Sequence, residues 1–406
     1  MSQLSDKLKA LGVSLGTSGL PARSEQKVGR GTLLEILPGD FTHLGTLFET
    51  EQVYAMDYQH GLHQLWQPAH NAITSLTGLD FKLQDLVFLD AETTGLSGGT
   101  GTFAFMIGLG WLDGHNNFKV RQIFLPEPGS ELAFLTALME ELSPFTTVVS
   151  FNGKSFDIPL LNSRYVLHAM PSPFSQMAHI DLLHLARSIW RYRLSSRTLG
   201  DLETHILHFE RGEEELPGWM APKLYLEYLH SGNAFPLKGM FYHNQIDIVS
   251  LAALLSAIEH TLSFNVKNSL ELFALAELFE KSADPQQAGR AYAETILMAE
   301  GSTLAAQARF RLGLMARRQE NWQSAVAYWQ EAADLHPGAC VELAKYFEHQ
   351  ARDYVTATLW CRKAITLFTR DFAPAAAKNE IIRCDLEHRL ERLNRKMERK
   401  EEHDGQ

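Results

Sequence analysis

The alternation of strand-like and helix-like segments in the first two thirds of this chain most limits the folds available to it. Three runs rich in β-forming residues follow one another at 86–90, 102–111 and 118–125. Leucines and a methionine on one face then predict a helix over 131–142, and a further apolar strand is expected over 146–151. Strands that meander, followed by a helix and another strand, predict an α/β domain in which helices flank a sheet.

Strand patterns stop near residue 266, and the rest of the chain predicts helices alone. Residues 321–329 realign with 353–361 at an offset of 32, and an amphipathic helix precedes each copy. Helix pairs at such a period resemble tetratricopeptide repeats, with an unrelated helical bundle as the alternative. We therefore expect four parts: a partly irregular extension over 1–80, the α/β domain over 81–262, helical repeats over 266–380, and a charged helix and tail over 381–406.

Composition narrows the class of protein. With 45% hydrophobic and 21% charged residues among 406, each domain can bury a core. The net charge of −11 argues against a basic surface that coats nucleic acid, but it does not exclude an enzyme that acts on nucleic acid. Three cysteines are too few for a disulfide framework. No stretch approaches the roughly 18 apolar residues of a membrane span, so we expect a cytoplasmic protein without a membrane partner.

Two carboxylates, Asp90 and Glu92, stand at the end of the first strand of this domain. Residues i and i+2 of a strand point to the same face, so the two side chains project together. Carboxylates this close repel each other unless cations lie between them, and hard oxygen ligands suit Mg²⁺ or Mn²⁺. Taken alone the pair also fits an ordinary turn cap, so its interpretation depends on acidic partners elsewhere in the chain.

Two later segments supply such partners. After the strand at 146–151 the chain reads Asn152-Gly153, then Phe156-Asp157 at the start of a helix. His243 and Asp247 lie four residues apart and so share one face of a later helix. Asp157 alone fits a helix N-terminal charge, and a lone histidine is usually structural. Together with the first pair, they predict a metal site with a candidate general base.

A basic and aromatic stretch lies between these segments. Arg191 and Arg193 alternate with Trp190 and Tyr192. Such a stretch can contact a phosphate backbone and stack a base, and it fits an exposed helix face equally well. We name both arginines as candidate substrate-binding residues.

The ordered motifs resemble the DEDD superfamily of 3′–5′ exonucleases. This resemblance implies a ribonuclease-H-like α/β fold, a mixed five-stranded sheet with flanking helices. The first motif, Asp-x-Glu, is matched by Asp90 and Glu92, and Thr93 opens the Thr-Thr-Gly-Leu-Ser-Gly-Gly run at 93–99. This run, the stretch at 232–237 and the His243-Asn244-x-x-Asp247 segment are similar to the YprB-like ribonuclease-H-like proteins. The resemblance covers about 85–262.

The resemblance implies that four carboxylates hold two divalent cations, Mg²⁺ or Mn²⁺: Asp90, Glu92, Asp157 and Asp247. It also implies that Asn152, Phe156 and Thr93 contact the substrate. The usual histidine version places four residues between His and Asp, and the tyrosine version places three. Here His243 has the three-residue spacing and Tyr242 the four-residue spacing, so either can be the general base. His243 is favoured because it shares the helical face of Asp247.

These expectations predict a metal-dependent exonuclease that acts on ends of DNA or RNA and binds a protein partner through its helical repeats. The main alternative is a scaffold or nucleic-acid-binding protein in which the repeats bind the partner and nuclease activity is weak or absent. An unrelated metal-dependent hydrolase is a third possibility.

Overall fold

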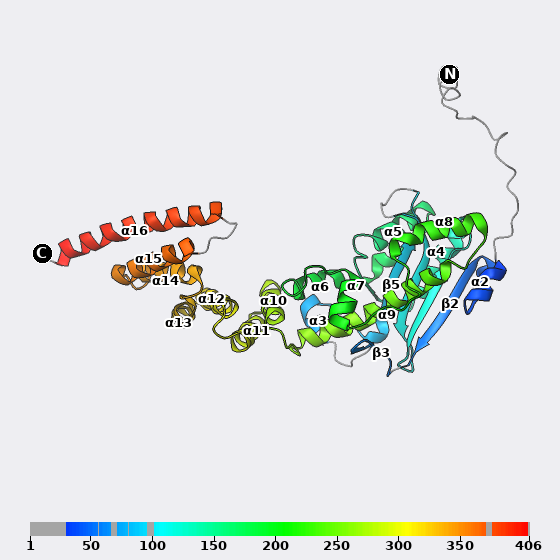
Figure 1. Cartoon of the computed structure of the whole chain (residues 1–406), viewed down its shortest axis with the longest axis horizontal. Coiled ribbons are helices and arrows are strands. Elements are labelled where there is room, and N and C mark those ends of the chain that lie inside the picture. The colour runs from blue at the N-terminus through cyan, green and yellow to red at the C-terminus, as the bar shows by residue number, and fades with distance from the viewer. Residues whose placement is uncertain are drawn as a thin grey trace, which may run out of the picture. The chain divides into compact units, whose positions relative to one another are not determined.

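The protein, examined as a computed structural model, is described over residues 30–55, 57–65, 71–79, 81–95, 101–370 and 376–404 (Figure 1). Its contacts divide the chain into two compact units. The first unit comprises Met1–Met56, Lys82–Ile180 and Arg211–Val249, and the second comprises Asp57–Phe81, Asp181–Glu210 and Ser250–Gln406. Each unit thus draws on separate stretches of the chain. The linear domain bounds expected from the sequence remain a prediction.

A seven-stranded mixed sheet forms the centre of the first unit. In chain order its strands are β1 (Gly39–Thr42), β2 (Leu47–Tyr54), β5 (Leu86–Thr93), β6 (Ala104–Leu112), β7 (Phe118–Phe124), β8 (Thr147–Ser150) and β9 (Ala178–Asp181). The spatial order is β1-β2-β7-β6-β5-β8-β9. Neighbours from β1 to β5 are antiparallel, and β8 runs parallel to β5. The predicted α/β fold with a mixed sheet and flanking helices is confirmed.

The predicted number of strands was wrong, because two strands come from the N-terminal extension. β2 pairs with the outer edge of β7, in a register that runs from Phe48 opposite Phe124 to Tyr54 opposite Phe118. Leu47 and Phe48 are fully buried, so packing against the sheet holds this segment extended. The four strands located from the sequence form the contiguous block β7-β6-β5-β8 beside it, and β9 follows β8 in the sheet.

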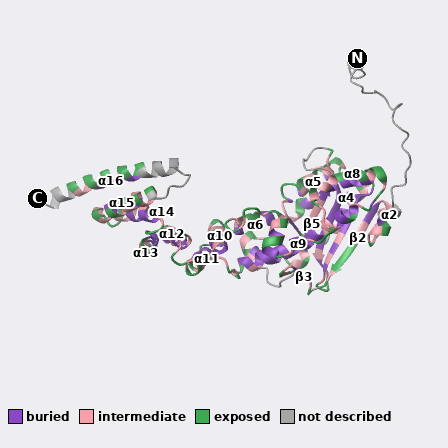
Figure 2. Ribbon diagram, viewed as in Figure 1, coloured by how far each residue is buried: buried purple, intermediate pink, exposed green. Residues whose placement is uncertain are grey.

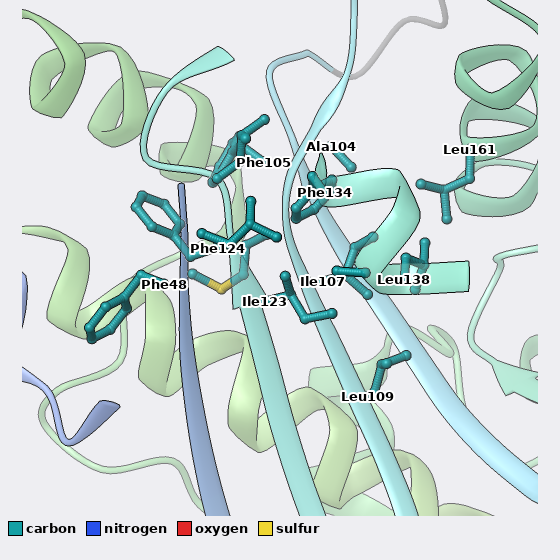
Figure 3. Close-up of a cluster of buried hydrophobic side chains, with 14 of the residues drawn as sticks. Phe48, Ala104, Phe105, Ile107, Leu109, Ile123, Phe124, Phe134, Leu138 and Leu161 are labelled. Carbon is teal, nitrogen blue, oxygen red and sulfur yellow. The ribbon is translucent and has the colours of Figure 1, made fainter. Parts of the chain in front are cut away.

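Helices cover both faces of this sheet, which explains why β6 is apolar at nearly every position. Ile107 and Leu109 of β6 lie in one core cluster with Phe134 and Leu138 of α4 (Glu131–Leu142) and Leu161 of α5 (Asp157–Leu167), as Figure 3 shows. Figure 2 shows the buried residues running along the strands and the inner sides of the helices. The other helices in this unit are α2 (Arg30–Ile36), α8 (Ala221–Ser231) and the N-terminal half of α9 (Leu237–Leu262).

Two glycines of β6 allow α9 to lie against the sheet. A Cβ atom on Gly108 would overlap Oδ1 of Asn244 and come within 2.8 Å of Cγ1 of Ile248. A Cβ atom on Gly110 would overlap Ile248 as well and lie 2.7 Å from Cζ of Phe118. Glycine inside a strand is expected where another backbone approaches closely, and here the approaching element is the helix that carries His243 and Asp247.

Consecutive helices make up most of the second unit. They are α10 (Ser269–Lys281), α11 (Pro285–Met298), α12 (Thr303–Arg318), α13 (Trp322–Ala332), α14 (Pro337–His349), α15 (Tyr354–Arg370) and α16 (Ala376–Asp404). They pack in the pairs α10–α11, α12–α13 and α14–α15, so the predicted all-helical C-terminal region is confirmed. In the core cluster of α12 to α16, many small residues pack with leucines and the large aromatic Trp329. The unit also contains α3 (Asn71–Thr77), α6 (Leu182–Ile189), α7 (Leu199–Leu202) and the hairpin β3–β4 (Gln59–His60, His63–Gln64).

A buried carboxylate attaches the last helix to α14. The side chain of Glu348 is fully buried and pairs with Arg389 at 2.5 Å, Arg392 at 2.8 Å and Lys396 at 2.8 Å, all on α16. These cations outweigh the effect of burial and lower the pKa of Glu348 to about 2. The basic residues of the predicted charged helix therefore have a structural partner.

The helix α9 is long and apolar enough to cross a membrane by length and composition. The sequence analysis did not foresee this, because polar residues such as Asn244 and Asp247 interrupt its apolar residues. Within the protein, 83% of its most apolar window is buried, as in the core helix of a soluble protein.

Candidate active site

A pocket of about 760 Å³ in the first unit brings together most of the side chains that the sequence singled out. Its lining includes eight of them: Asp90, Glu92, Thr93, Asn152, Phe156, Asp157, His243 and Asp247. They come from the end of β5, the turn between β8 and α5, and the middle of α9. Three segments that are distant in sequence thus meet at one site.

The end of β5 holds Asp90 and Glu92 on one side of the strand. Nδ2 of Asn244 donates a hydrogen bond of 2.9 Å to Oδ2 of Asp90. Asn244 is fully buried, and its Oδ1 accepts a hydrogen bond of 2.9 Å from Nε2 of Gln122 on β7. Gln122 also donates to the backbone carbonyl of Phe241 at 2.8 Å. A buried polar chain from β7 through α9 therefore fixes the orientation of Asp90.

The carboxylates of the pocket disfavour their own ionisation. Burial, followed by the charges of Asp247, Glu92 and Asp157, raises the pKa of Asp90 well above its usual range, and the hydrogen bond from Asn244 opposes this only in part. Burial raises the pKa of Glu92 to about 7, although the attraction of His243 works the other way. Negative charge collected in a buried pocket is the arrangement that a bound cation would relieve.

The turn between β8 and α5 presents Phe156 and Asp157 to the pocket. Asn152 adopts a left-handed conformation with φ of 66°, which asparagine tolerates better than most residues. Gly153 follows, where a Cβ atom would lie 2.7 Å from Cβ of Ser150. Asp157 stands in the first turn of α5, and Phe156 is 56% exposed although it lines the pocket.

The helix α9 turns His243 and Asp247 toward the pocket, as their spacing predicted. Nε2 of His243 lies 3.4 Å from Oδ2 of Asp247 and 3.9 Å from Oε1 of Glu92. Tyr242 points elsewhere, because its hydroxyl accepts a hydrogen bond of 2.9 Å from the backbone N–H of Gly212, and it does not line the pocket. Of the two candidate bases, His243 is the one that the fold brings to the carboxylates.

The sequence analysis missed Arg211 and Glu215, which contact His243 and Asp247 beside the pocket. The guanidinium group of Arg211 forms an ion pair with Asp247 and contacts Oε1 of Glu215 at 2.9 Å. Oε1 of Glu215 lies 2.6 Å from Nδ1 of His243. In the sequence both stand in the charged run Arg211-Gly212-Glu213-Glu214-Glu215, which is typical of an exposed loop. Only the fold distinguishes them from their neighbours.

The candidate substrate residues Arg191 and Arg193 do not line this pocket. Both belong to the second unit, where they form ion pairs with Glu277 and Glu271 of α10. Tyr192 donates a further hydrogen bond of 2.8 Å to Glu277. Their positive charges are therefore matched by carboxylates of the same unit, and a contact with nucleic acid remains a prediction.

The donor set suits divalent cations in its chemistry. Four carboxylates that line one pocket are the hard oxygen ligands that Mg²⁺ and Mn²⁺ prefer. Across the described part of the chain, however, no group of three or more His, Cys, Asp or Glu side chains is arranged to hold a metal ion as it stands. The ion pair with Arg211 gives Asp247, one of the four carboxylates, a cationic partner.

Comparison with known proteins agrees with the fold. Residues 87–259 match the RNase_H superfamily, so the chain carries a ribonuclease-H-like domain. Members of this superfamily generally use divalent cations, and membership indicates a nuclease-type function. Over 364 residues the chain is 30% identical to the uncharacterized protein YprB of Bacillus subtilis (strain 168), and the match covers 85% of each protein. The chain belongs to the same family as YprB.

Proposed function

We propose that this protein is a metal-dependent 3′–5′ exonuclease of the DEDD type, acting on ends of single-stranded DNA or RNA. The observation that carries the proposal is the meeting of Asp90, Glu92, Asp157, Asp247 and His243 in one pocket. These residues come from three separate segments, so their meeting is not a consequence of sequence proximity. A volume of about 760 Å³ lies within the range of roughly 300–1,000 Å³ typical of sites for small ligands, which suits a terminal nucleotide.

The four carboxylates would hold two Mg²⁺ or Mn²⁺ ions. Bound cations of this kind neutralise a phosphodiester and lower the pKa of water. Their binding would also remove the mutual repulsion that raises the pKa of Asp90 and Glu92. Since Arg211 pairs with Asp247, cation binding would require its guanidinium group to give up part of that contact.

The remaining side chains would orient the reacting groups. His243 would accept the proton of the attacking water at Nε2, the nitrogen that faces Asp247 and Glu92. Phe156 would stack on the terminal base with its half-exposed ring. Asn152 and Thr93 line the same pocket and would contact the sugar and phosphate of that nucleotide.

End-labelled substrates test this proposal. With Mn²⁺ present, a 3′–5′ exonuclease releases label from a 3′-labelled single strand as mononucleotide and converts a 5′-labelled strand into a shortening ladder. Circular single strands of the same sequence should survive. Asp90→Ala and Asp157→Ala should abolish the activity, whereas Glu140→Ala, which removes an exposed carboxylate of α4, should keep it. Degradation by the two pocket variants at the rate of the unmodified protein would refute the proposal.

A second candidate is a nucleic-acid-binding scaffold with weak or no nuclease activity. The pairing of Arg211 with Asp247 favours it, because one of the four carboxylates already has a cationic partner. In this case the helix pairs from α10 to α15, which we propose to be tetratricopeptide-like repeats, would bind a protein partner. An electrophoretic mobility assay tests this candidate. If the protein binds labelled single strands but leaves them intact in the presence of Mn²⁺, the scaffold is favoured over the exonuclease.

A further inference from the structure

The loop before α8 brings a carboxylate to His243 from the side opposite the acidic pocket. Oε1 of Glu215 lies 2.6 Å from Nδ1 of the imidazole, while Nε2 of the same ring faces Asp247 and Glu92. The two ring nitrogens thus meet different partners. Glu215 itself does not line the pocket, so it is not placed to hold a cation or touch a substrate there.

The hydrogen positions follow from the three distances in this contact. An ionised carboxylate only accepts hydrogen bonds, so a separation of 2.6 Å requires a proton on Nδ1. In the alternative, Nδ1 accepts a hydrogen bond from Arg211 at 3.0 Å. Nδ1 and Oε1 of Glu215 would then be two acceptors only 2.6 Å apart. Arg211 instead donates a charge-assisted hydrogen bond to Oε1 of Glu215 at 2.9 Å.

A glycine leaves the other ring nitrogen open. Gly218 lines the pocket in the short helix η7 (Gly218–Met220), and a Cβ atom there would lie 2.9 Å from Nε2 of His243. Any side chain at this position would cover that nitrogen or displace the ring. The loop from Arg211 to Gly218 therefore does two things for His243: it binds Nδ1 and it keeps Nε2 accessible.

We propose that Glu215 is a positioning residue that holds His243 in the tautomer with its proton on Nδ1, so that Nε2 is the nitrogen available to accept a proton. Which nitrogen carries the proton is commonly set by the hydrogen bond of the other nitrogen. This inference rests on the proposed function for its catalytic meaning. The tautomer itself is a property of the folded protein and can be measured without substrate.

The first experiment reads the tautomer in metal-free protein. Histidine is labelled with ¹⁵N, and the ring signals of His243 are assigned by their loss in His243→Gln. At a pH alkaline enough to neutralise the imidazole, Nδ1 should show the shift of a protonated nitrogen and Nε2 that of a bare one. Glu215→Ala should reverse the pattern, and Glu215→Gln, which retains an acceptor oxygen, should preserve it. A proton on Nε2 in the unmodified protein would overturn the inference.

The second experiment reads turnover on the end-labelled strands. Glu215→Ala should lower kcat by about 10- to 100-fold, the scale seen when partners that orient histidine ligands are removed, and leave KM within about twofold. Glu215→Gln should recover part of that loss. Glu214→Ala is the matched control, because this exposed neighbour pairs with Lys238 and not with the histidine.

The two experiments separate the inference from the proposed function. Unchanged kcat in Glu215→Ala, together with an unchanged tautomer, would overturn the role of Glu215 and leave the exonuclease proposal intact. Absence of turnover in the unmodified protein, with the tautomer as expected, would overturn the exonuclease proposal and the catalytic meaning of the tautomer, while the contact itself would stand.

Discussion

Replacing Glu92, a buried carboxylate of the pocket, by Gln should stabilise the protein when no metal is present. Burial raises the pKa of Glu92 from 4.5 to about 7, and neighbouring carboxylates add to that effect. At about 1.4 kcal/mol per pH unit, such a rise corresponds to about 3 kcal/mol. The folded protein bears this cost whenever Glu92 is ionised, and a glutamine of the same shape does not.

The sign of the pH dependence follows from the raised pKa. Because the folded state binds the proton of Glu92 more tightly than the unfolded state, stability falls as the pH rises from 4.5 to about 7. The free energy of unfolding of Glu92→Gln should therefore exceed that of the unmodified protein by about 3 kcal/mol at about pH 8, and the difference should vanish near pH 4.5. Excess Mn²⁺ should reduce or reverse the difference in stability between Glu92→Gln and the unmodified protein at the higher pH, because the ion stabilises only a folded state that binds it.

Because the chain has two compact units, the assay must report on the first one. Unfolding in urea is therefore measured in the presence of a chelator, with hydrogen–deuterium exchange of the β5 and β6 amides as the readout. Glu140→Gln, an exposed substitution on α4, should show no such dependence on pH. Equal stability of Glu92→Gln and the unmodified protein at both pH values would refute the reasoning that burial and like charges strain this carboxylate.

Three further predictions test other parts of the structure. Gly108→Val should lower the free energy of unfolding by about 1–3 kcal/mol in a urea titration, since its side chain would overlap Asn244, whereas Gly114→Ala, in open space, should not. Glu348→Gln should cost the second unit about 1–3 kcal/mol at neutral pH, and because the pKa of Glu348 is lowered to about 2, the loss should disappear as the pH falls from 4.5 toward 2. Phe156→Ala should raise KM for single strands by about 5- to 100-fold, as expected for a lost base stack, with kcat unchanged in steady-state assays.

The parts of the fold that the sequence predicted are those with a strong local signal. The strands β5 and β7 and the helix α4 follow from β-forming runs and from one leucine-rich face. β2 lacked such a signal, since its side chains alternate only loosely and its place depends on pairing with β7. Local periodicity therefore predicts the central strands of the sheet, whereas the position of β2 near its edge depends on tertiary packing.

The same division applies to the site. Asp90 and Glu92 are brought together by strand geometry, and His243 and Asp247 by helix geometry, so spacing alone predicted each pair. Arg211 reaches Asp247 across 36 residues, and no local pattern encodes that contact.

The arginines at 191 and 193 illustrate the converse. Their charges were plain in the sequence, but their partners Glu277 and Glu271 lie 86 and 78 residues away. A charge can be read from the sequence, whereas the group that neutralises it depends on the fold.

The glycines of β6 carry a consequence for how such a site can be lost. His243 and Asp247 reach across to β5 only because Gly108 and Gly110 present no side chain to α9. A methyl group at either glycine would overlap Asn244 or Ile248, and an outward movement of the helix to relieve that overlap would separate Asp247 from Asp90 and Glu92 of β5. A descendant of this chain could therefore keep all four carboxylates and its histidine, and still lose its pocket through a residue that never touches a ligand. In an inactive relative, the cause of the inactivity should then be sought first in β6, the strand against which α9 packs.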